Sequence, residues 1–317
     1  MSTPKIDAVV IGRNEGKRLL ACLASLKGQV RHLIYVDSGS DDGSVAAARE
    51  MGATVVELDI SQPFTAARAR NAGLAMLSDD CSLVQLVDGD CIVDPDWFSR
   101  AISFLQANPN VAVVCGRRRE RFPDASVYNR LCDQEWDTPL GEAKACGGDA
   151  LMYLAPLRQA GGYREDLIAG EEPELCLRLR MAGWQIWRLD AEMTLHDAQM
   201  LHFAQWWTRT RRAGYAFAEG ATLHGAPPER HWVAETRRAL LWGMGLPFAI
   251  ALSSLVTSWA LVALLIYPAQ LLRLSRRLGW ETAIFSLLGK TPEALGALDY
   301  HWHRILGRKR GLIEYKS

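Results

Sequence analysis

Short apolar runs alternate with amphipathic stretches along the first third of the chain. Runs rich in Val, Ile and Leu have the length of buried strands, whereas leucines three or four residues apart mark helical faces. The pattern predicts strands at 7–12, 33–36, 53–58, 83–87 and 111–115, and helices at 17–27, 44–51, 64–77 and 96–106. This alternation is typical of right-handed βαβ units. We therefore expect an α/β fold, with a doubly wound, mostly parallel sheet and flanking helices.

The hydropathy of the chain changes after residue 230. Residues 240–268 are nearly uncharged, and this run exceeds the roughly 20 residues that span a bilayer. Arginines flank the run on both sides, which fits a single span poorly: Arg237, Arg238, Arg273, Arg276 and Arg277. Pro247 and Ser253-Ser254 allow a break into a re-entrant or interfacial hairpin, so the topology stays open. We expect two domains, 1–230 and a membrane-associated helical tail at 231–317, with a buried core helix as the alternative.

Charge and cysteine content narrow the class of protein. The chain has 36 basic and 36 acidic residues among 317, so its formal net charge is +0. Such a chain has no general electrostatic attraction to nucleic acid, and we expect no nucleic-acid partner. The seven cysteines are scattered and form no C-x-x-C pair. This pattern indicates a reducing compartment, without a disulfide framework or a zinc site.

The most informative polar residues follow the apolar run at 83–87. Asp88-Gly89-Asp90 stands where this buried strand emerges, and ligands of open α/β sheets collect at the carboxyl ends of strands. Paired carboxylates beside a glycine suit a divalent cation that itself holds a diphosphate. An ordinary turn is the alternative, because Asp and Gly are common turn residues.

Two neighbouring strand ends carry acidic groups as well. Glu15 follows the first strand and Asp37 the second, where a carboxylate can accept hydrogen bonds from a base or a ribose. Helix capping explains part of the run 37–42. Arg68 and Arg70 lie on the helix predicted at 64–77, where they could neutralise the negative charge of a nucleotide. Alternatively, they are two solvated arginines.

A dinucleotide-binding enzyme would begin with the same strand and helix. Its glycine-rich G-x-G-x-x-G turn is absent, however, and Gly12-Arg13-Asn14-Glu15-Gly16 stands in its place. The first turn therefore argues against a nicotinamide or flavin enzyme.

Several motifs follow one another in a fixed order. The first half carries Asn14-Glu15, the acidic run 37–44, Ala69-Arg70-Asn71-Ala72-Gly73 and Asp88-Gly89-Asp90. The second half carries Gly147-Gly148-Asp149 and a segment from Gly161-Gly162-Tyr163 to Glu171-Glu172. Over residues 6–220 this combination resembles the family 2 glycosyltransferases, inverting enzymes of the GT-A fold, in their bacterial membrane-associated form.

The resemblance implies transfer of a sugar from a nucleotide diphosphate to a hydroxyl, with residues 1–115 binding the nucleotide and 116–230 the acceptor. Mg²⁺ or Mn²⁺ would lie on Asp90, with His196 as a further ligand and Asp88 on the ribose or on the metal through water. The nucleotide would be bound by Asn14, Glu15, Asp37, Arg68, Arg70 and Asp88. The acceptor would be bound by Gly148, Asp149 and Arg212.

The resemblance also implies a general base at the start of a helix predicted at 173–182. The family usually has Glu-Asp there, with the second acid as base, whereas this chain has Glu171-Glu172. Glu172 is therefore the expected base, with one extra methylene, and Glu171 its catalytic neighbour. Alternatively, the two acids only stabilise the positive end of the helix dipole.

The expected donor is a UDP-sugar, and the expected acceptor is a lipid-linked or cell-envelope glycan. The acceptor rests on the apolar tail, which also predicts attachment to the inner membrane with the catalytic domain facing the cytoplasm. Two other classes share the sheet or the tail. One is a sugar-phosphate nucleotidyltransferase, which needs a better phosphate loop after the first strand. The other is a catalytically inactive, membrane-bound sugar-binding module, against which intact Asp90 and Glu172 argue.

Overall fold

The computed structural model describes residues 4–307 of the chain. The described residues fall into two compact units, which meet between Gln199 and Met200. The domain boundary expected after residue 230 falls inside the second unit, between its first two helices. Residues 308–317 of the expected tail lie outside the described residues.

The first half of unit 1 is a parallel sheet with its helices. Its strands are β1 (Ile6–Gly12), β2 (His32–Asp37), β3 (Thr54–Glu57) and β4 (Leu83–Asp88), paired in the order β3-β2-β1-β4. Between them run α1 (Lys17–Leu26), α2 (Ser44–Glu50) and α3 (Ala66–Ala75), and α3 packs on β1 and β2. Leu83, Val84, Leu86 and Val87 of β4 are buried, because a central parallel strand is covered on both faces.

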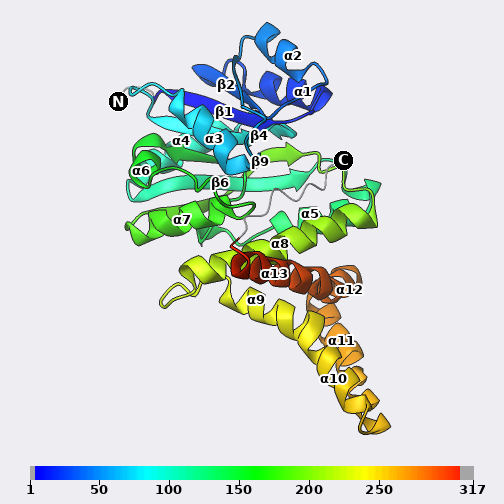
Figure 1. Cartoon of the computed structure of the whole chain (residues 1–317). Coiled ribbons are helices and arrows are strands. Elements are labelled where there is room, and N and C mark those ends of the chain that lie inside the picture. The colour runs from blue at the N-terminus through cyan, green and yellow to red at the C-terminus, as the bar shows by residue number, and fades with distance from the viewer. Residues whose placement is uncertain (1–3, 308–317) are drawn as a thin grey trace. The chain divides into compact units, whose positions relative to one another are not determined.

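The second half of unit 1 extends the sheet with strands of both directions (Figure 1). The added strands are β5 (Cys91–Val93), β6 (Val111–Glu120), β7 (Gly141–Ala143), β8 (Ala150–Tyr153) and β9 (Gln185–His196). β8 is antiparallel to β4 and β6, whereas β6 and β9 are parallel. The helices here are α4 (Trp97–Ala107), η1 (Pro123–Ala125), α5 (Val127–Trp136), α6 (Leu154–Gln159) and α7 (Glu171–Met181). The expected α/β class, mostly parallel with flanking helices, is confirmed.

The sheet register brings the acidic strand ends together. Asp37 of β2 is level with Gly12 of β1, and Asp88 of β4 is level with Ile11. Asp37 and Asp88 are thus two strands apart at the same edge, about 10 Å across the sheet. The helix expected at 173–182 begins two residues earlier, at Glu171, because Gly170 turns the chain with a positive φ of 81°.

Unit 2 is entirely helical in its described part. Its elements are α8 (Phe203–His224), α9 (Val233–Leu240), the π-helix η2 (Leu241–Gly245), α10 (Leu246–Ser254), the 3₁₀ helix η3 (Ser258–Leu265), α11 (Ile266–Leu278), α12 (Trp280–Leu288) and α13 (Lys290–Ile305). α13 packs against α8. A Cβ added at Gly296 would lie 1.9 Å from the backbone oxygen of Arg211, so only glycine fits there.

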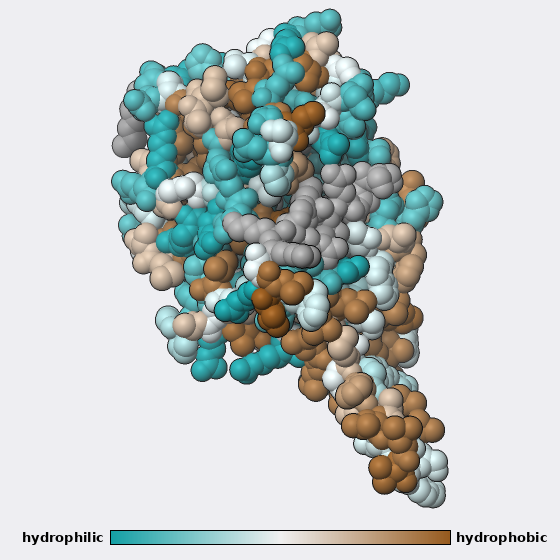
Figure 2. Space-filling model, in the orientation of Figure 1, coloured by the Kyte–Doolittle hydropathy of each residue, from teal (hydrophilic) through white to brown (hydrophobic). Residues whose placement is uncertain are grey.

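The apolar run at 240–268 is a helical hairpin rather than one continuous helix. η2 and α10 end near Ser254, the chain is extended at Thr257 (φ −150°), and η3 returns to pack against α10. The turn exposes Leu255, Val256 and Trp259 at 80% or more, and Figure 2 shows the hydrophobic surface of this segment. Among residues 4–307, one helix is long and apolar enough to cross a membrane, Ser258–Leu278, and its apolar window has no buried part.

Candidate active site

The turn that links β4 to β5 holds Asp88 and Asp90. The Gly89 amide donates to the carbonyl oxygen of Ile11 over 2.8 Å, which fixes the turn against the end of β1. A Cβ on Gly89 would lie 3.1 Å from that oxygen, so the glycine allows this close approach. The segment is therefore a tight turn, which was the alternative interpretation of its sequence. The same turn also places two carboxylates at the carboxyl edge of the sheet.

Asp88 lies in a cluster of charges supplied by separate elements. Arg70 of α3 donates to the Asp88 Oδ1 over 2.8 Å and, through its other terminal nitrogen, to Glu171 Oε1 over 2.6 Å. Arg118 of β6 approaches Asp88 Oδ2 at 3.3 Å, and its guanidinium stacks on the Trp136 ring. Burial alone would raise the pKa of Asp88, but the two guanidinium groups outweigh burial and lower it. Arg70 is 3% exposed, so the alternative of a solvated arginine is wrong for this residue.

The loop before β8 closes over this cluster. A Cβ on Gly148 would lie 2.7 Å from Asp88 Oδ2 and 3.1 Å from an Arg118 nitrogen, so the absence of a side chain leaves room for the charges. Asp149 is completely buried. It accepts the Asp88 amide at 3.0 Å and the Thr194 hydroxyl at 2.8 Å, and it thereby fixes the end of β4.

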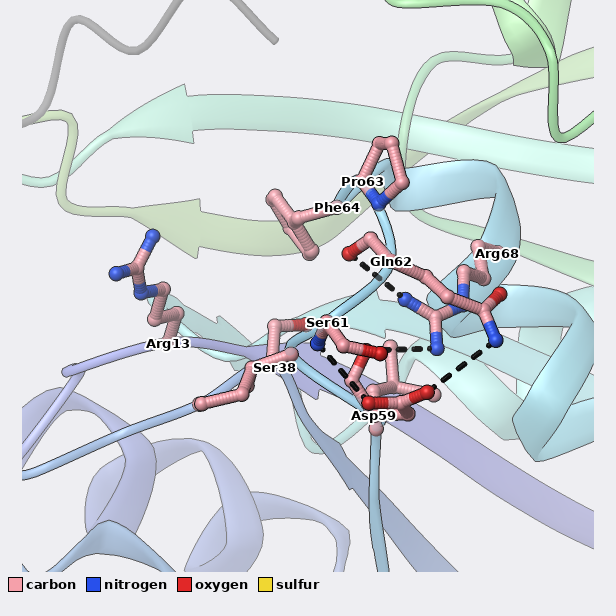
Figure 3. A pocket seen from close by; sticks show the side chains of 11 residues that line it. Arg13, Ser38, Asp59, Ser61, Gln62, Pro63, Phe64 and Arg68 are labelled. Carbon is pink, nitrogen blue, oxygen red and sulfur yellow. Dashed lines mark hydrogen bonds between the residues drawn. The ribbon is translucent and has the colours of Figure 1, made fainter. Parts of the chain in front are cut away.

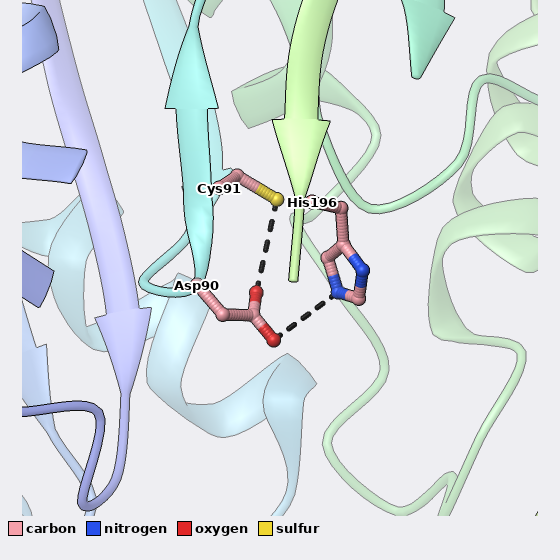
Figure 4. Close-up of side chains that lie close together, drawn as sticks. All are labelled: Asp90, Cys91 and His196. Carbon is pink, nitrogen blue, oxygen red and sulfur yellow. Dashed lines mark hydrogen bonds and ion pairs between the residues drawn. The ribbon is translucent and has the colours of Figure 1, made fainter. Parts of the chain in front are cut away.

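Asp90 faces His196 across the edge of the sheet (Figure 4). Its Oδ2 lies 3.1 Å from His196 Nε2, and both residues are buried. His196 ends β9 and is the register partner of Cys91 on β5 and of Glu120 on β6, which is why these four residues meet. The buried His196 Nδ1 has no hydrogen-bond partner among residues 4–307, with Glu120 Oε2 at 3.7 Å.

The chemistry of this group fits a divalent cation. Asp90, Cys91 and His196 offer ligand atoms within 4.8 Å of one another. Carboxylate oxygen and imidazole nitrogen are ligands that Mn²⁺ accepts, and Mg²⁺ takes the carboxylate. A carboxylate behind the far nitrogen of the imidazole, as Glu120 is here, is the usual support of a metal-ligating histidine.

The two glutamates at the start of α7 have different surroundings. Glu171 pairs with Arg70, as described above. Glu172 is buried, and its Oε1 accepts hydrogen bonds from the Cys146 amide (2.6 Å), the Cys146 thiol (2.9 Å) and the Cys176 thiol (2.9 Å). Burial raises the pKa of Glu172 above its usual value. The helix dipole thus acts on both acids, but only Glu171 has a cationic partner among the described ion pairs.

The ends of β1, β2 and β3 border a cavity of about 520 Å³ (Figure 3). It is lined by Arg13, Ser38, the loop 58–64 and Arg68. Arg68 reaches the cavity while holding the backbone oxygens of Asp59 and Gln62. A cavity of this size is in the range that small-molecule ligands occupy.

The remaining residues expected to bind the nucleotide shape the loops beside the cavity. Asp37 is buried and accepts from the Tyr35 hydroxyl and the Gly39 and Ser40 amides, at 2.8–2.9 Å. Asn14 ties the first loop to the second: its side-chain oxygen accepts the Asp41 amide at 2.9 Å. Glu15 pairs with Arg18 at 2.6 Å.

One expected acceptor residue, Arg212, lies on α8 and belongs to unit 2. Sequence reasoning did not single out Arg13, Arg118, Glu120 and Trp136 or the pair Cys146 and Cys176. Arg118 and Glu120 lie at the end of β6, which starts at Val111. The predicted strand stops at residue 115; a prediction that extended it to residue 120 would have placed both side chains at the same edge of the sheet.

Comparison with known proteins shows a family likeness over the first part of the chain. The model of "Glycosyl transferase family 2" matches residues 7–144. Curated relatives include a TPR repeat-containing protein of Synechococcus elongatus, 38% identical over 127 residues (40% of this chain, 30% of the relative). Glucomannan 4-beta-mannosyltransferase 2 of Arabidopsis thaliana is 27% identical over 116 residues (33% and 22%). Glycosyltransferase AglE of Haloferax volcanii is 22% identical over 196 residues (58% and 64%). The chain thus spans less than a third of the first two relatives.

Solved structures share the fold. Mannosyltransferase PcManGT from Pyrobaculum calidifontis, in complex with GDP-Man and Mn²⁺, aligns with a TM-score of 0.69 at 20% identity, over 96% of this chain and 89% of that one. S. aureus TarS aligns with a TM-score of 0.51 at 15% identity, over 74% and 43%. The expected GT-A fold is confirmed. Residues 7–144 are similar to glycosyl transferase family 2, and this part of the chain carries the strand-end acids Asp37, Asp88 and Asp90.

Proposed function

We propose that the chain transfers a sugar from a nucleotide-diphosphate sugar to a hydroxyl group, with inversion and with the help of Mg²⁺ or Mn²⁺. One observation carries the proposal: the two carboxylates of the β4–β5 turn, Asp88 and Asp90, belong to two different clusters. Asp88 is held by Arg70 and Arg118, whereas Asp90 faces His196. A site for a diphosphate with its cation needs such a combination of positive charge and hard ligands.

The cavity beside β1, β2 and β3 is the proposed site of the nucleoside. Arg13 and Arg68 line it, and a positive wall suits a nucleotide. Asp37, Asn14 and Glu15 hold the two loops that border it, and Asp37 would exchange one of its amide contacts for a base or ribose donor. A nucleotide bound in this way would extend its diphosphate toward Asp88, which lies two strands from Asp37.

Asp90 and His196 would hold the cation, and Asp88 would reach the ribose or the cation through water. The bound cation would supply positive charge for the departing diphosphate. Arg70 and Arg118 add fixed positive charge on the other side of Asp88. Asp149 holds the Asp88 backbone in place, and the bare Gly148 leaves room at the cluster for a sugar or an acceptor.

Glu172 is the proposed general base. Glu171 is paired with Arg70, so its carboxylate is already engaged by a guanidinium group. Burial raises the pKa of Glu172, which makes its carboxylate a stronger proton acceptor. Glu172→Gln should therefore keep donor binding and lose transfer, because a neutral amide accepts no proton. If Glu171→Gln is the inactive variant instead, the base is the neighbouring residue.

The exposed apolar hairpin of unit 2 supports attachment to a membrane, and therefore a lipid-linked or cell-envelope acceptor at the cytoplasmic face of the inner membrane. Arg212, on α8 of the same unit, is a proposed acceptor contact. Leu255, Val256 and Trp259 would enter the lipid together, because each is exposed at the turn between α10 and η3. Fractionation followed by a carbonate wash tests this part. A protein that stays in the soluble fraction before the wash contradicts it.

The reaction is tested by incubating the protein with Mn²⁺ and a panel of donors. The panel holds UDP-sugars and also GDP-mannose, since the structural relative PcManGT is bound to GDP-Man. Transfer or donor hydrolysis releases nucleoside diphosphate. Release of pyrophosphate instead would identify a nucleotidyltransferase, and binding without either product would identify an inactive sugar-binding module.

A further inference from the structure

Two cysteines that are 30 residues apart in the chain meet at Glu172. Cys146 lies on the loop between β7 and β8, and Cys176 lies on α7, one turn after Glu172. Their sulfur atoms are 3.6 Å apart, and each lies 2.9 Å from Glu172 Oε1. The three atoms thus form a compact group of one carboxylate and two thiols.

Among residues 4–307, no cationic side chain forms an ion pair with the carboxylate of this group, in contrast to the Arg70 contact of Glu171. Burial raises the pKa of the Cys146 thiol well above its usual value. Cys146 lowers the pKa of Cys176 through a hydrogen bond, but burial and Glu172 raise it to about 11. At neutral pH both thiols are therefore protonated and donate to the carboxylate.

The spacing of the two sulfur atoms fits the ligand shell of a soft cation. Zinc–sulfur bonds of about 2.3 Å in a tetrahedral site place two sulfur atoms about 3.8 Å apart. The observed 3.6 Å is close to this spacing. Each sulfur–oxygen distance would have to open from 2.9 Å by roughly 0.7 Å to hold the same cation. Cys146 is the more exposed of the two cysteines, which gives the site an entrance.

We propose that Cys146, Cys176 and Glu172 bind a thiophilic divalent cation such as Zn²⁺ or Cd²⁺, at a site distinct from the Asp90–His196 pair, and that the bound cation inhibits transfer. The cation replaces the two thiol protons, which pass to solvent, and no oxidation takes place. Thiolate ligands favour such cations over Mg²⁺. The inhibitory part rests on the proposed role of Glu172 as base, because a metal-bound carboxylate no longer accepts the acceptor's proton.

Cation binding is tested on the full chain with Cd²⁺, in the presence of a non-thiol reductant. Cadmium–thiolate bonds absorb in the ultraviolet, so the titration counts sulfur ligands directly. Cys91→Ser is the matched control, since Cys91 is the thiol beside Asp90 and His196. The absorption band should persist in Cys91→Ser and disappear in the double variant Cys146→Ser/Cys176→Ser. A band that is lost in Cys91→Ser, or unchanged in the double variant, overturns the site.

A second variant guards against misfolding of the double variant. Cys146→Ala changes only the loop residue, and it should weaken Cd²⁺ binding at least ten-fold and halve the absorption per bound cation. Circular dichroism verifies that each variant is folded. A folded Cys146→Ala that binds Cd²⁺ as the wild type does also overturns the site.

The functional part is measured as Zn²⁺ inhibition of Mn²⁺-dependent turnover, relative to the uninhibited rate of each variant. Wild type and Cys91→Ser should lose at least ten-fold in rate, and the double Cys variant should resist the same Zn²⁺ concentration. Cd²⁺ binding to the two cysteines without inhibition leaves the cation site in place but overturns inhibition, and with it the role of Glu172. Absence of turnover in every protein, with Cd²⁺ still bound, contradicts the proposed reaction rather than the site.

Discussion

Replacing Arg70 tests how much the charge cluster at the end of β4 contributes to the free energy of unfolding. Arg70→Ala removes a guanidinium that is 3% exposed and contacts Asp88 at 2.8 Å and Glu171 at 2.6 Å. Removing one partner of a buried ion pair typically costs about 3–5 kcal/mol, because the remaining charge loses its compensation. The side chains of Asp88 and Glu171 retain 27% and 12% exposure, and Arg118 still contacts Asp88. We therefore expect the low end, a loss of about 3 kcal/mol.

Urea unfolding measures this loss, with Arg68→Ala as the matched control on the same helix. The Arg68 guanidinium donates to the backbone oxygens of Gln62 and Asp59, at 3.3 and 3.0 Å, in an exposed setting. Its removal should cost less than about 1 kcal/mol, the range of exposed interactions. Equal losses for the two variants, or a loss below about 1 kcal/mol for Arg70→Ala, would refute the reasoning about the cluster.

Three further predictions address the loop, the base and the helical unit. Gly148→Ala places a Cβ 2.7 Å from Asp88 Oδ2, so a folded variant should lose at least ten-fold in turnover; wild-type activity would show that the cluster tolerates displacement. Burial raises the pKa of Glu172, and a base must be deprotonated, so kcat/KM should fall as pH drops through a midpoint above 4.5; a midpoint at or below 4.5 contradicts the assignment. Gly296→Val meets the Arg211 backbone at 1.9 Å and should lower stability in thermal melting by about 3 kcal/mol, whereas an unchanged Tm would contradict the packing of α13 on α8.

The strand ends were predictable because burial leaves a strong trace in the sequence. The apolar run at 83–87 is typical of a strand covered on both faces, so the residues after it are expected at a sheet edge. Asp37 and Asp88 could therefore be placed at one edge before their register was known. Their spacing across the sheet depends on pairing between distant strands, which local pattern does not encode.

The partners of the acidic residues could not be predicted in the same way. Arg118 and Glu120 reach the site because β6 is ten residues long and extends beyond the apolar run, which ends at Cys115. Cys146 meets Glu172 through a loop whose path is set by tertiary packing. The unit boundary was also hidden: hydropathy changes near residue 230, but α8 packs on α13 and so belongs to the second unit.

The central claim is that Asp90 and His196 hold a cation that in turn holds a diphosphate beside Asp88. Calorimetric titration of the protein with UDP and with GDP, with and without Mn²⁺, tests it most directly. We predict that one of these nucleotides binds at least ten-fold more tightly with Mn²⁺, and that Asp90→Ala abolishes this gain while the protein stays folded. Nucleotide binding that is equally tight without Mn²⁺, or unchanged in Asp90→Ala, would contradict it.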